Sequence, residues 1–365
     1  MVKNKYFYYL FLINALINVV NFVPRGLIAQ RFSGAMMAIV ISVPIGLLLM
    51  YLCIKMMSKF PGEGIPEIFN ANYPKPVTKF MLFGHTLLWY IAGLITLIAF
   101  VDVTMRYITS DVSPLLIMVG FLVVVCLAIR VTAESILYAL EVVIIINVPI
   151  IIYVLFKALL NPMFSWDAVM QVITYSLKAP SYGSISYATF IFTGYLNLAV
   201  FNRAFKKIRV RHIWMIGVVG FLVLIASVLI PIGYQGTIGV ERHVYPWFST
   251  ADVLRTKNFI VERVLFFFYF TYLTLSLVSS IVHWHVALEM LKGVFLTEEK
   301  KKRKIDPEWW MILAFCIVAF FAMRTNQFFR DRAGLLFLDI RLAAEFFLIA
   351  SVYLAYKRRE AKKRE

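Results

Sequence analysis

Three asparagines stand in an apolar stretch near the N-terminus, where amide chemistry is least expected. Asn14, Asn18 and Asn21 are four and three residues apart, so a helix would place them on one face. An amide in hydrocarbon costs free energy unless it finds a hydrogen-bonding partner, so this face meets either a ligand cavity or another helix. Both interpretations remain open. The Val23-Pro24-Arg25 step that follows either interrupts the helix at mid-membrane or simply ends it.

A second polar interruption lies in the middle of the chain. Residues 180–184 read Pro-Ser-Tyr-Gly-Ser, and Thr193-Gly194-Tyr195 and Asn197 follow within an apolar stretch. Backbone groups that lose their helical partners can hold a polar ligand when they line a cavity inside the protein. The sequence therefore predicts two interrupted helices, one in each half of the chain.

Two further apolar stretches carry polar residues at helical spacing. Thr86, Tyr90 and Gly93 share one face of the first, and this face is a candidate pocket wall, whereas aromatic residues near a helix end would otherwise form an interfacial belt. The second stretch carries its polar residues partly on one face: Tyr272, Ser276, Ser279, Ser280 and His283. His283 is either a ligand contact or a histidine satisfied near its helix end.

Charged residues within apolar stretches need partners. Asp102 and Arg106 are four residues apart, and so are Arg341 and Glu345, which favours structural pairing on one helix face over a proton relay. Glu141 has no obvious local partner and is the best single ionisable candidate for a functional role.

Motifs of enzyme chemistry are absent from the sequence. There is no GxSxG, Walker-type, HExxH or CxxC motif, and only His283 and His285 stand at a spacing that suggests a metal. Cys53, Cys126 and Cys316 lie in apolar stretches, are odd in number and suit small packing positions. We therefore expect no catalytic residue, no metal and no cofactor.

The composition indicates the kind of fold that must position these polar residues. Of 365 residues, 61% are hydrophobic and 16% are charged, and the mean hydropathy is +0.81, which excludes an ordinary soluble enzyme. Unbroken apolar runs of about twenty residues are typical of membrane-spanning helices rather than of barrel strands. The sequence predicts an all-α membrane protein with ten spans, near residues 6–29, 34–57, 80–107, 114–130, 135–159, 185–204, 213–236, 260–289, 309–324 and 334–356.

The net charge of +17 does not indicate nucleic-acid binding, because the basic residues lie between the apolar segments. With the N-terminus inside, roughly two thirds of the Lys and Arg residues fall on the cytoplasmic side, including the runs at 203–211 and 300–304 and the C-terminal tail. Both termini are therefore expected in the cytoplasm, with the chain in a lipid bilayer.

A cut near residue 170 leaves five spans on each side, which is the condition for an inverted repeat. We expect one transmembrane domain over residues 1–365, with repeats at about 6–160 and 185–356. Residue-level similarity between the halves is not visible.

Several segments together resemble the B-subunit family of spore germinant receptors, the GerAB-like proteins of the amino acid–polyamine–organocation transporter superfamily. These segments are the first span ending in Val23-Pro24-Arg25, the segment 245–249 (Tyr-Pro-Trp-Phe-Ser), the segment 259–263 (Phe-Ile-Val-Glu-Arg) and a short basic tail. One departure is that relatives usually carry glycines before the proline, whereas residues 17–21 here read Ile-Asn-Val-Val-Asn.

The resemblance implies a LeuT-like fold of five plus five spans and a nutrient-sensing subunit in the spore inner membrane. It further implies an A-type membrane subunit and a C-type lipoprotein as partners, and a small nutrient, such as an amino acid, as ligand. The family's pocket maps onto Asn18, Asn21, Tyr90, Thr193, Gly194, Ser279 and His283.

Two other classes of protein remain open. An amino acid transporter of the same superfamily would share the pocket, and a scaffold subunit would bind no ligand. For a receptor, we expect Tyr90→Ala or Gly194→Leu to abolish the germinant response at a normal protein level.

Overall fold

The computed structural model describes residues 2–206, 208, 210–255, 262–295 and 307–364. The basic run at 300–304 and the predicted start of the eighth span at 260 lie outside these residues, as do Lys207 and Arg209.

The described part of the chain is helical, and it contains no β-strand, only two isolated bridges. The helices that make up the long axis of the bundle are α1 (Lys5–Ile17) with its continuation α2 (Phe22–Ala29), α3 (Ala35–Met57), α5 (Lys75–Tyr107), α6 (Pro114–Ala128), α7 (Ala133–Leu159), α9 (Tyr182–Thr189) at the start of the run Tyr182–Ala204, α11 (Ile213–Gln235), α13 (Val264–Phe295), α14 (Pro307–Met323) and α15 (Gln327–Arg364). The shorter ones are α4 (Ile65–Asn72), α8 (Trp166–Ile173), α10 (Leu198–Phe201) and α12 (Pro246–Val253), with the 3₁₀ helices η1 (Phe190–Asn197), η2 (Asn202–Ala204) and η3 (Gly239–Arg242).

Six helical segments in the described residues are long and apolar enough to cross a bilayer: α3, α5, α7, the run Tyr182–Ala204, α11 and α13. The bent pair α1 and α2 makes a seventh. The other three predicted spans are helical too, but α6 and α14 have only 15 and 17 residues, and α15 carries three charged residues within 334–356. The chain is therefore a multi-pass helical membrane protein.

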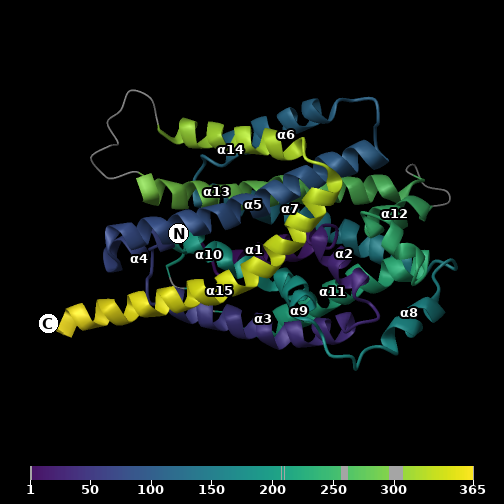
Figure 1. Ribbon diagram of the computed structural model, residues 1–365, viewed down its shortest axis with the longest axis horizontal. Helices are drawn as coiled ribbons and strands as arrows, with labels where there is room; N and C mark the ends of the chain where they lie inside the picture. The colour runs from purple at the N-terminus through teal and green to yellow at the C-terminus, as the bar shows by residue number, and fades with distance from the viewer. Residues whose placement is uncertain (1, 207, 209, 256–261, 296–306, 365) are drawn as a thin grey trace.

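The long helices run along one axis of the bundle (Figure 1). Helix α13 packs along α5, and α6 and α14 lie side by side on one flank, where the Sγ atoms of Cys126 and Cys316 are 3.3 Å apart. Buried apolar side chains from most helices form one continuous core.

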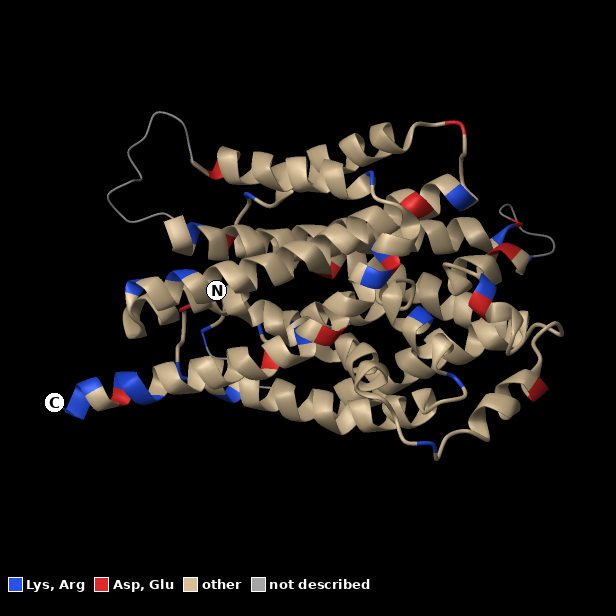
Figure 2. Ribbon diagram, in the orientation of Figure 1, with Lys and Arg blue, Asp and Glu red and all other residues tan. Residues whose placement is uncertain are grey.

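The two ends of the bundle differ, and we name them by what they contain. The terminal end holds α4 and the C-terminal part of α15, and the loop end holds α8, η3 and α12 (Figure 1). Charged residues concentrate at both ends, with a basic cluster on the C-terminal helix (Figure 2).

Ion pairs tie the helices together at the terminal end. Arg203 bonds Glu67 at 2.6 Å and also pairs with Glu289, and Lys292 pairs with Glu289 at 2.7 Å and with Glu308 at 2.6 Å. These contacts join α4, η2, α13 and α14 and close the bundle at this end.

Glu141 has no local partner, as the sequence indicates, but the fold gives it a distant one. Lys5 forms a salt bridge with its carboxylate, and the Tyr6 hydroxyl donates to it at 2.6 Å. The pair joins α1 to α7, and the sequence did not reveal it because the two residues are more than a hundred positions apart.

Candidate functional site

The first span is broken near its middle. Helix α1 ends at Ile17, α2 begins at Phe22, and the two axes differ by 54°. Pro24 lies in the first turn of α2, where its missing N–H costs no helical hydrogen bond. The predicted interruption is therefore confirmed, and the reading in which Pro24 ends the span is wrong, because the helix continues to Ala29.

Each of the three asparagines has a different role at this break. Asn14 donates to the carbonyl oxygens of Phe190 at 2.7 Å and Ile191 at 3.2 Å, both in the sixth span. Asn18 donates to the carbonyl of Asn14 at 2.7 Å. Asn21 accepts a hydrogen bond from the Tyr272 hydroxyl at 2.9 Å. Asn14 thus joins the first span to the sixth and Asn21 joins it to α13, whereas Asn18 bonds within the first span.

The sixth span departs from the α-helix in another way. It runs continuously from Tyr182 to Ala204, but the eight residues of η1 wind as a 3₁₀ helix. A 3₁₀ helix rises about 2.0 Å per residue instead of about 1.5 Å, so this part is stretched and narrowed rather than opened. The predicted interruption of the sixth span is therefore wrong, because the span stays helical throughout and only its winding changes.

Gly194 marks the place where the first and sixth spans touch. A Cβ atom at this position would lie 2.6 Å from the Phe11 Cα atom and closer still to the Leu10 carbonyl oxygen. Only a residue without a side chain fits against this backbone. Gly194 is therefore a helix-crossing residue.

Two small cavities lie between the first span, α5, η1, α13 and α15. The larger, which we name the central cavity, has a volume of about 40 Å³, and the smaller, which we name the break cavity, has about 10 Å³. They share Ala92, Phe190, His283 and Phe337, so they are two parts of one hollow. This hollow has room for roughly four water molecules, which is less than an amino acid needs.

The structure brings together five of the seven predicted site residues. Asn18, Asn21, Ser279 and His283 line the break cavity, and Thr193 lines the central cavity together with His283. Gly194 and Tyr90 line neither.

Tyr90 instead faces the flank formed by α14. Its hydroxyl donates to the Phe315 carbonyl at 2.7 Å, and its ring stacks on Trp284 with centroids 5.3 Å apart. The cavity face of α5 is formed by His85, Trp89 and Ala92. The predicted pocket wall of Thr86, Tyr90 and Gly93 is therefore wrong, because these residues line neither cavity.

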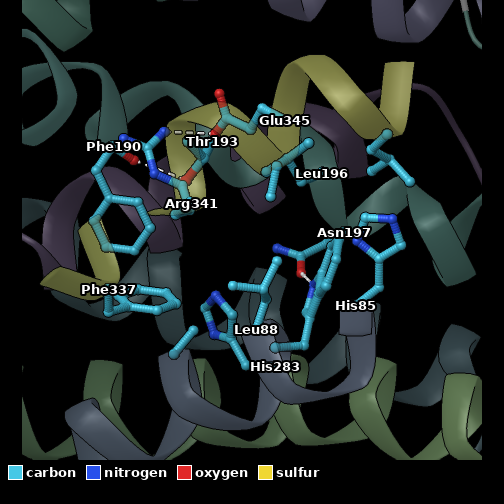
Figure 3. A pocket seen from close by; sticks show the side chains of 14 residues that line it. His85, Leu88, Phe190, Thr193, Leu196, Asn197, His283, Phe337, Arg341 and Glu345 are labelled. Carbon is cyan, nitrogen blue, oxygen red and sulfur yellow. Dashed lines mark hydrogen bonds and ion pairs between the residues drawn. The ribbon is translucent and has the colours of Figure 1, made fainter. Parts of the chain in front are cut away.

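Helix α15, the predicted tenth span, supplies two charged groups for which the sequence predicted only structural pairing. Arg341 and Glu345 pair at 2.6 Å as predicted, both are buried, and both line the central cavity (Figure 3). Arg341 also bonds the Ser186 carbonyl and, at 3.1 Å, the Thr189 hydroxyl. No hydrogen bond to its Nε atom is present among the described residues.

Histidines bring further hydrogen-bonding groups to the cavity. His283 Nδ1 lies 2.7 Å from the Ser279 carbonyl oxygen, which can only accept, so Nδ1 carries a proton. In a neutral ring Nε2 is then an acceptor. His85 lies on the other side of the cavity (Figure 3), and its buried Nε2 atom has no partner in the described residues. The sequence did not identify His85 as a cavity residue, because it stands alone near the start of the predicted span 80–107.

Phe22 and Phe337 line both this hollow and a larger one. Phe190 and Phe337 meet edge to face at a centroid distance of 6.0 Å on one side of the central cavity (Figure 3). Beyond Phe337 and Phe22 lies a mainly apolar hollow of about 360 Å³, which we name the vestibule. Its polar lining includes Asp102, Tyr245 and Arg330.

Polar contacts hold the vestibule wall at the loop end. Arg106 donates to Asp102 at 2.9 Å, which confirms the predicted pair. Burial, with the nearby Asp102 carboxylate as a second cause, raises the pKa of the Tyr245 phenol well above its ordinary value. This phenol therefore stays neutral and serves as a hydrogen-bonding group. No cluster of side chains in the described residues could hold a metal ion.

A search of curated proteins found no match to the chain. A family model described as spore germination protein, the spore permease family, matches residues 6–328. The match includes the broken first span, the 3₁₀ segment and the Ser279–His283 wall, whereas Arg341 and Glu345 lie beyond it. The chain belongs to the spore germination protein family.

Proposed function

We propose that the chain is the nutrient-binding membrane subunit of a spore germinant receptor, with an amino acid as the class of ligand. The observation that carries the proposal is the broken first span, which presents Asn18, Asn21 and the start of α2 to a buried polar hollow. Membership in a spore germination family supports the biological context.

The break cavity suits a zwitterion. The first N–H groups of α2 have no partner within their own helix, and the positive end of the helix dipole favours a carboxylate there. His283 Nε2 accepts from an ammonium group, and Glu345 adds negative charge in the adjoining central cavity. Apolar neighbours such as Phe190 and Phe337 leave space for a small side chain once they move.

Ligand binding requires the hollow to widen, because its present volume is too small for an amino acid. The entry route runs from the vestibule past Phe22 and Phe337, while the ion pairs of Arg203 and Lys292 keep the terminal end closed. A ligand that binds the widened arrangement more tightly shifts the equilibrium toward it, and this shift is the signal.

The finer topology belongs to the same proposal. The chain is one transmembrane domain of ten spans, with inverted repeats at about 6–160 and 185–356 in a LeuT-like arrangement. The terminal end, with its basic tail, faces the cytoplasm, and the loop end faces outward. The protein resides in the spore inner membrane and passes its signal to an A-type membrane subunit and a C-type lipoprotein.

A thermal-shift screen of the purified chain against single amino acids, sugars and nucleosides tests the proposal. We expect an amino acid to raise the melting temperature of the wild type. The same amino acid should leave His283→Gln unshifted and should still shift His212→Gln, whose histidine is exposed. Equal shifts in both variants would refute the pocket.

An amino acid transporter of the same superfamily is the alternative, because the pocket would be the same. Uptake of the radiolabelled screening hit into proteoliposomes that contain only this chain separates the two functions. The receptor proposal predicts binding without accumulation, and accumulation above that of empty liposomes would establish transport.

A further inference from the structure

A second hollow lies on the other side of the broken span. It has a volume of about 500 Å³ and lies between α1, α7, α11 and α13, and we name it the lateral groove. This volume is within the range of about 300–1,000 Å³ typical of ligand pockets and exceeds that of the central cavity more than tenfold. No charged residue in the described part of the chain lines it.

The lateral groove opens toward the bilayer. Ile152 on α7 and Leu222 on α11 line it, and their side chains are 48% and 58% exposed. In a membrane-spanning bundle such positions face lipid. Thus a molecule already dissolved in the bilayer reaches the groove without crossing water.

The groove also contains two polar groups without partners. Trp247 is 2% exposed and Thr271 is 4% exposed, and both line the groove. The indole Nε1 and the hydroxyl Oγ1 have no hydrogen-bonding partner in the described residues. A buried donor without a partner costs free energy, so these two atoms indicate a missing acceptor.

Trp247 lies in the first turn of α12 at the loop end, and the groove extends from there along α13 toward Leu275. A molecule that fills the groove therefore needs a hydrogen-bond acceptor beside Trp247 and an apolar chain along the rest of the groove. A phospholipid has its groups in this order, because its ester carbonyl lies nearer the interface than its acyl chain. An apolar helix of a partner protein has no free acceptor to offer, because its carbonyls are bonded within the helix.

We propose that the lateral groove binds one acyl chain of a bilayer phospholipid, whose ester carbonyl accepts hydrogen bonds from Trp247 Nε1 and Thr271 Oγ1. The methylenes then pack on Val19 and Val20, which line the groove from the middle of the break. Asn18 and Asn21 face the break cavity on the opposite side. This division accounts for the two valines that stand between the two asparagines at residues 18–21.

Photolabelling tests the proposal with the full chain in nanodiscs that contain phosphatidylglycerol with a diazirine in the acyl chain. We expect adducts on α7 and α11 at the groove rim. Ala226→Phe, which fills the groove, should reduce them about tenfold. Gly120→Phe is the matched control, because a side chain at this exposed position on α6 meets nothing, and it should leave the groove adducts unchanged.

A second experiment tests the hydrogen bonds to the ester carbonyl. An ether-linked analogue of the probe lacks the ester carbonyl, so it should label the wild type about fivefold less. The double variant Trp247→Phe with Thr271→Val should label equally weakly with both probes. Equal labelling of the wild type by both probes would overturn the proposal. Full displacement of the lipid probe by free fatty acid would overturn it too, and so would cross-links to a second protein chain in place of lipid adducts.

Discussion

The first and sixth spans both leave the α-helical path near mid-membrane, but they do so in opposite ways. The first opens at residues 18–21 and bends by 54°, while the sixth stays continuous and winds more tightly over Phe190–Asn197. Asn14 and Gly194 join the two at their crossing. The comparison indicates that backbone N–H and C=O groups at such a departure can serve a ligand only where neighbouring helices do not already bond them.

In the sixth span those groups are already used. Asn14 binds the carbonyls of Phe190 and Ile191, Thr193 donates to the Phe190 carbonyl at 2.8 Å, and Arg341 holds Ser186 and Thr189 from α15. The first span instead presents the start of α2 to the break cavity. We therefore assign the sixth span the role of a rigid wall and the first span the role of ligand-binding element.

The largest expected effect comes from Arg341→Met, which removes the anchor of the sixth span and leaves Glu345 buried without its partner. We expect a loss of about 3–5 kcal/mol in the free energy of unfolding, measured by denaturant titration in detergent. Arg324→Met, at an exposed position, is the control and should change little. Adding Glu345→Leu to Arg341→Met should recover part of the loss, and a single variant as stable as wild type would contradict the anchoring role.

Gly194→Ala should come next. The added methyl group meets the backbone of α1, which cannot move aside as a side chain could, so we expect a loss of about 3 kcal/mol. Gly84→Ala on α5, where a Cβ meets nothing, should be neutral or slightly stabilising. Equal stability of the two variants would show that the spans do not touch at Gly194.

Asn14→Leu should cost less, about 1.5 kcal/mol, because it removes hydrogen bonds between helices but keeps the volume of the side chain. In the same denaturant titration this loss should appear without any ligand present. A stability within error of wild type would mean that the 3₁₀ winding does not depend on Asn14.

Asn18→Leu should have the smallest effect on folding and the clearest effect on binding. Its side chain lines the break cavity and hydrogen-bonds only within its own span, so we expect a stability loss of about 1 kcal/mol. The thermal shift produced by the screening hit should be lost. A retained shift in Asn18→Leu would place the ligand elsewhere.

The sequence was a good guide to the helices, because apolar runs report burial in lipid directly. It could not reveal the 3₁₀ winding of the sixth span, which depends on Asn14 and on the approach of Leu10 and Phe11, contacts between residues more than 170 positions apart. Nor could it show that Lys5 pairs with Glu141.

For the site, helical spacing identified faces but not which face meets the cavity. On α5 the Tyr90 face packs on α14 and α13, while His85 and Trp89 line the cavity. The spacing of four between Arg341 and Glu345 predicted only their pairing, whereas the structure shows that Arg341 Nε has no hydrogen-bonding partner among the described residues. Because Gly194 packs against the backbone of Leu10 and Phe11, we now expect Gly194→Leu to lower the amount of folded protein, rather than to abolish the germinant response at a normal protein level.

The most direct test of the central claim is ligand protection of the break. In a background in which Cys53, Cys126 and Cys316 are replaced by Ala, the rate at which a small maleimide alkylates Asn21→Cys is measured with and without the amino acid from the screen. If the break binds the ligand, saturating amino acid should slow the reaction severalfold. An unchanged rate, with the thermal shift still present, would show that the ligand binds away from the break.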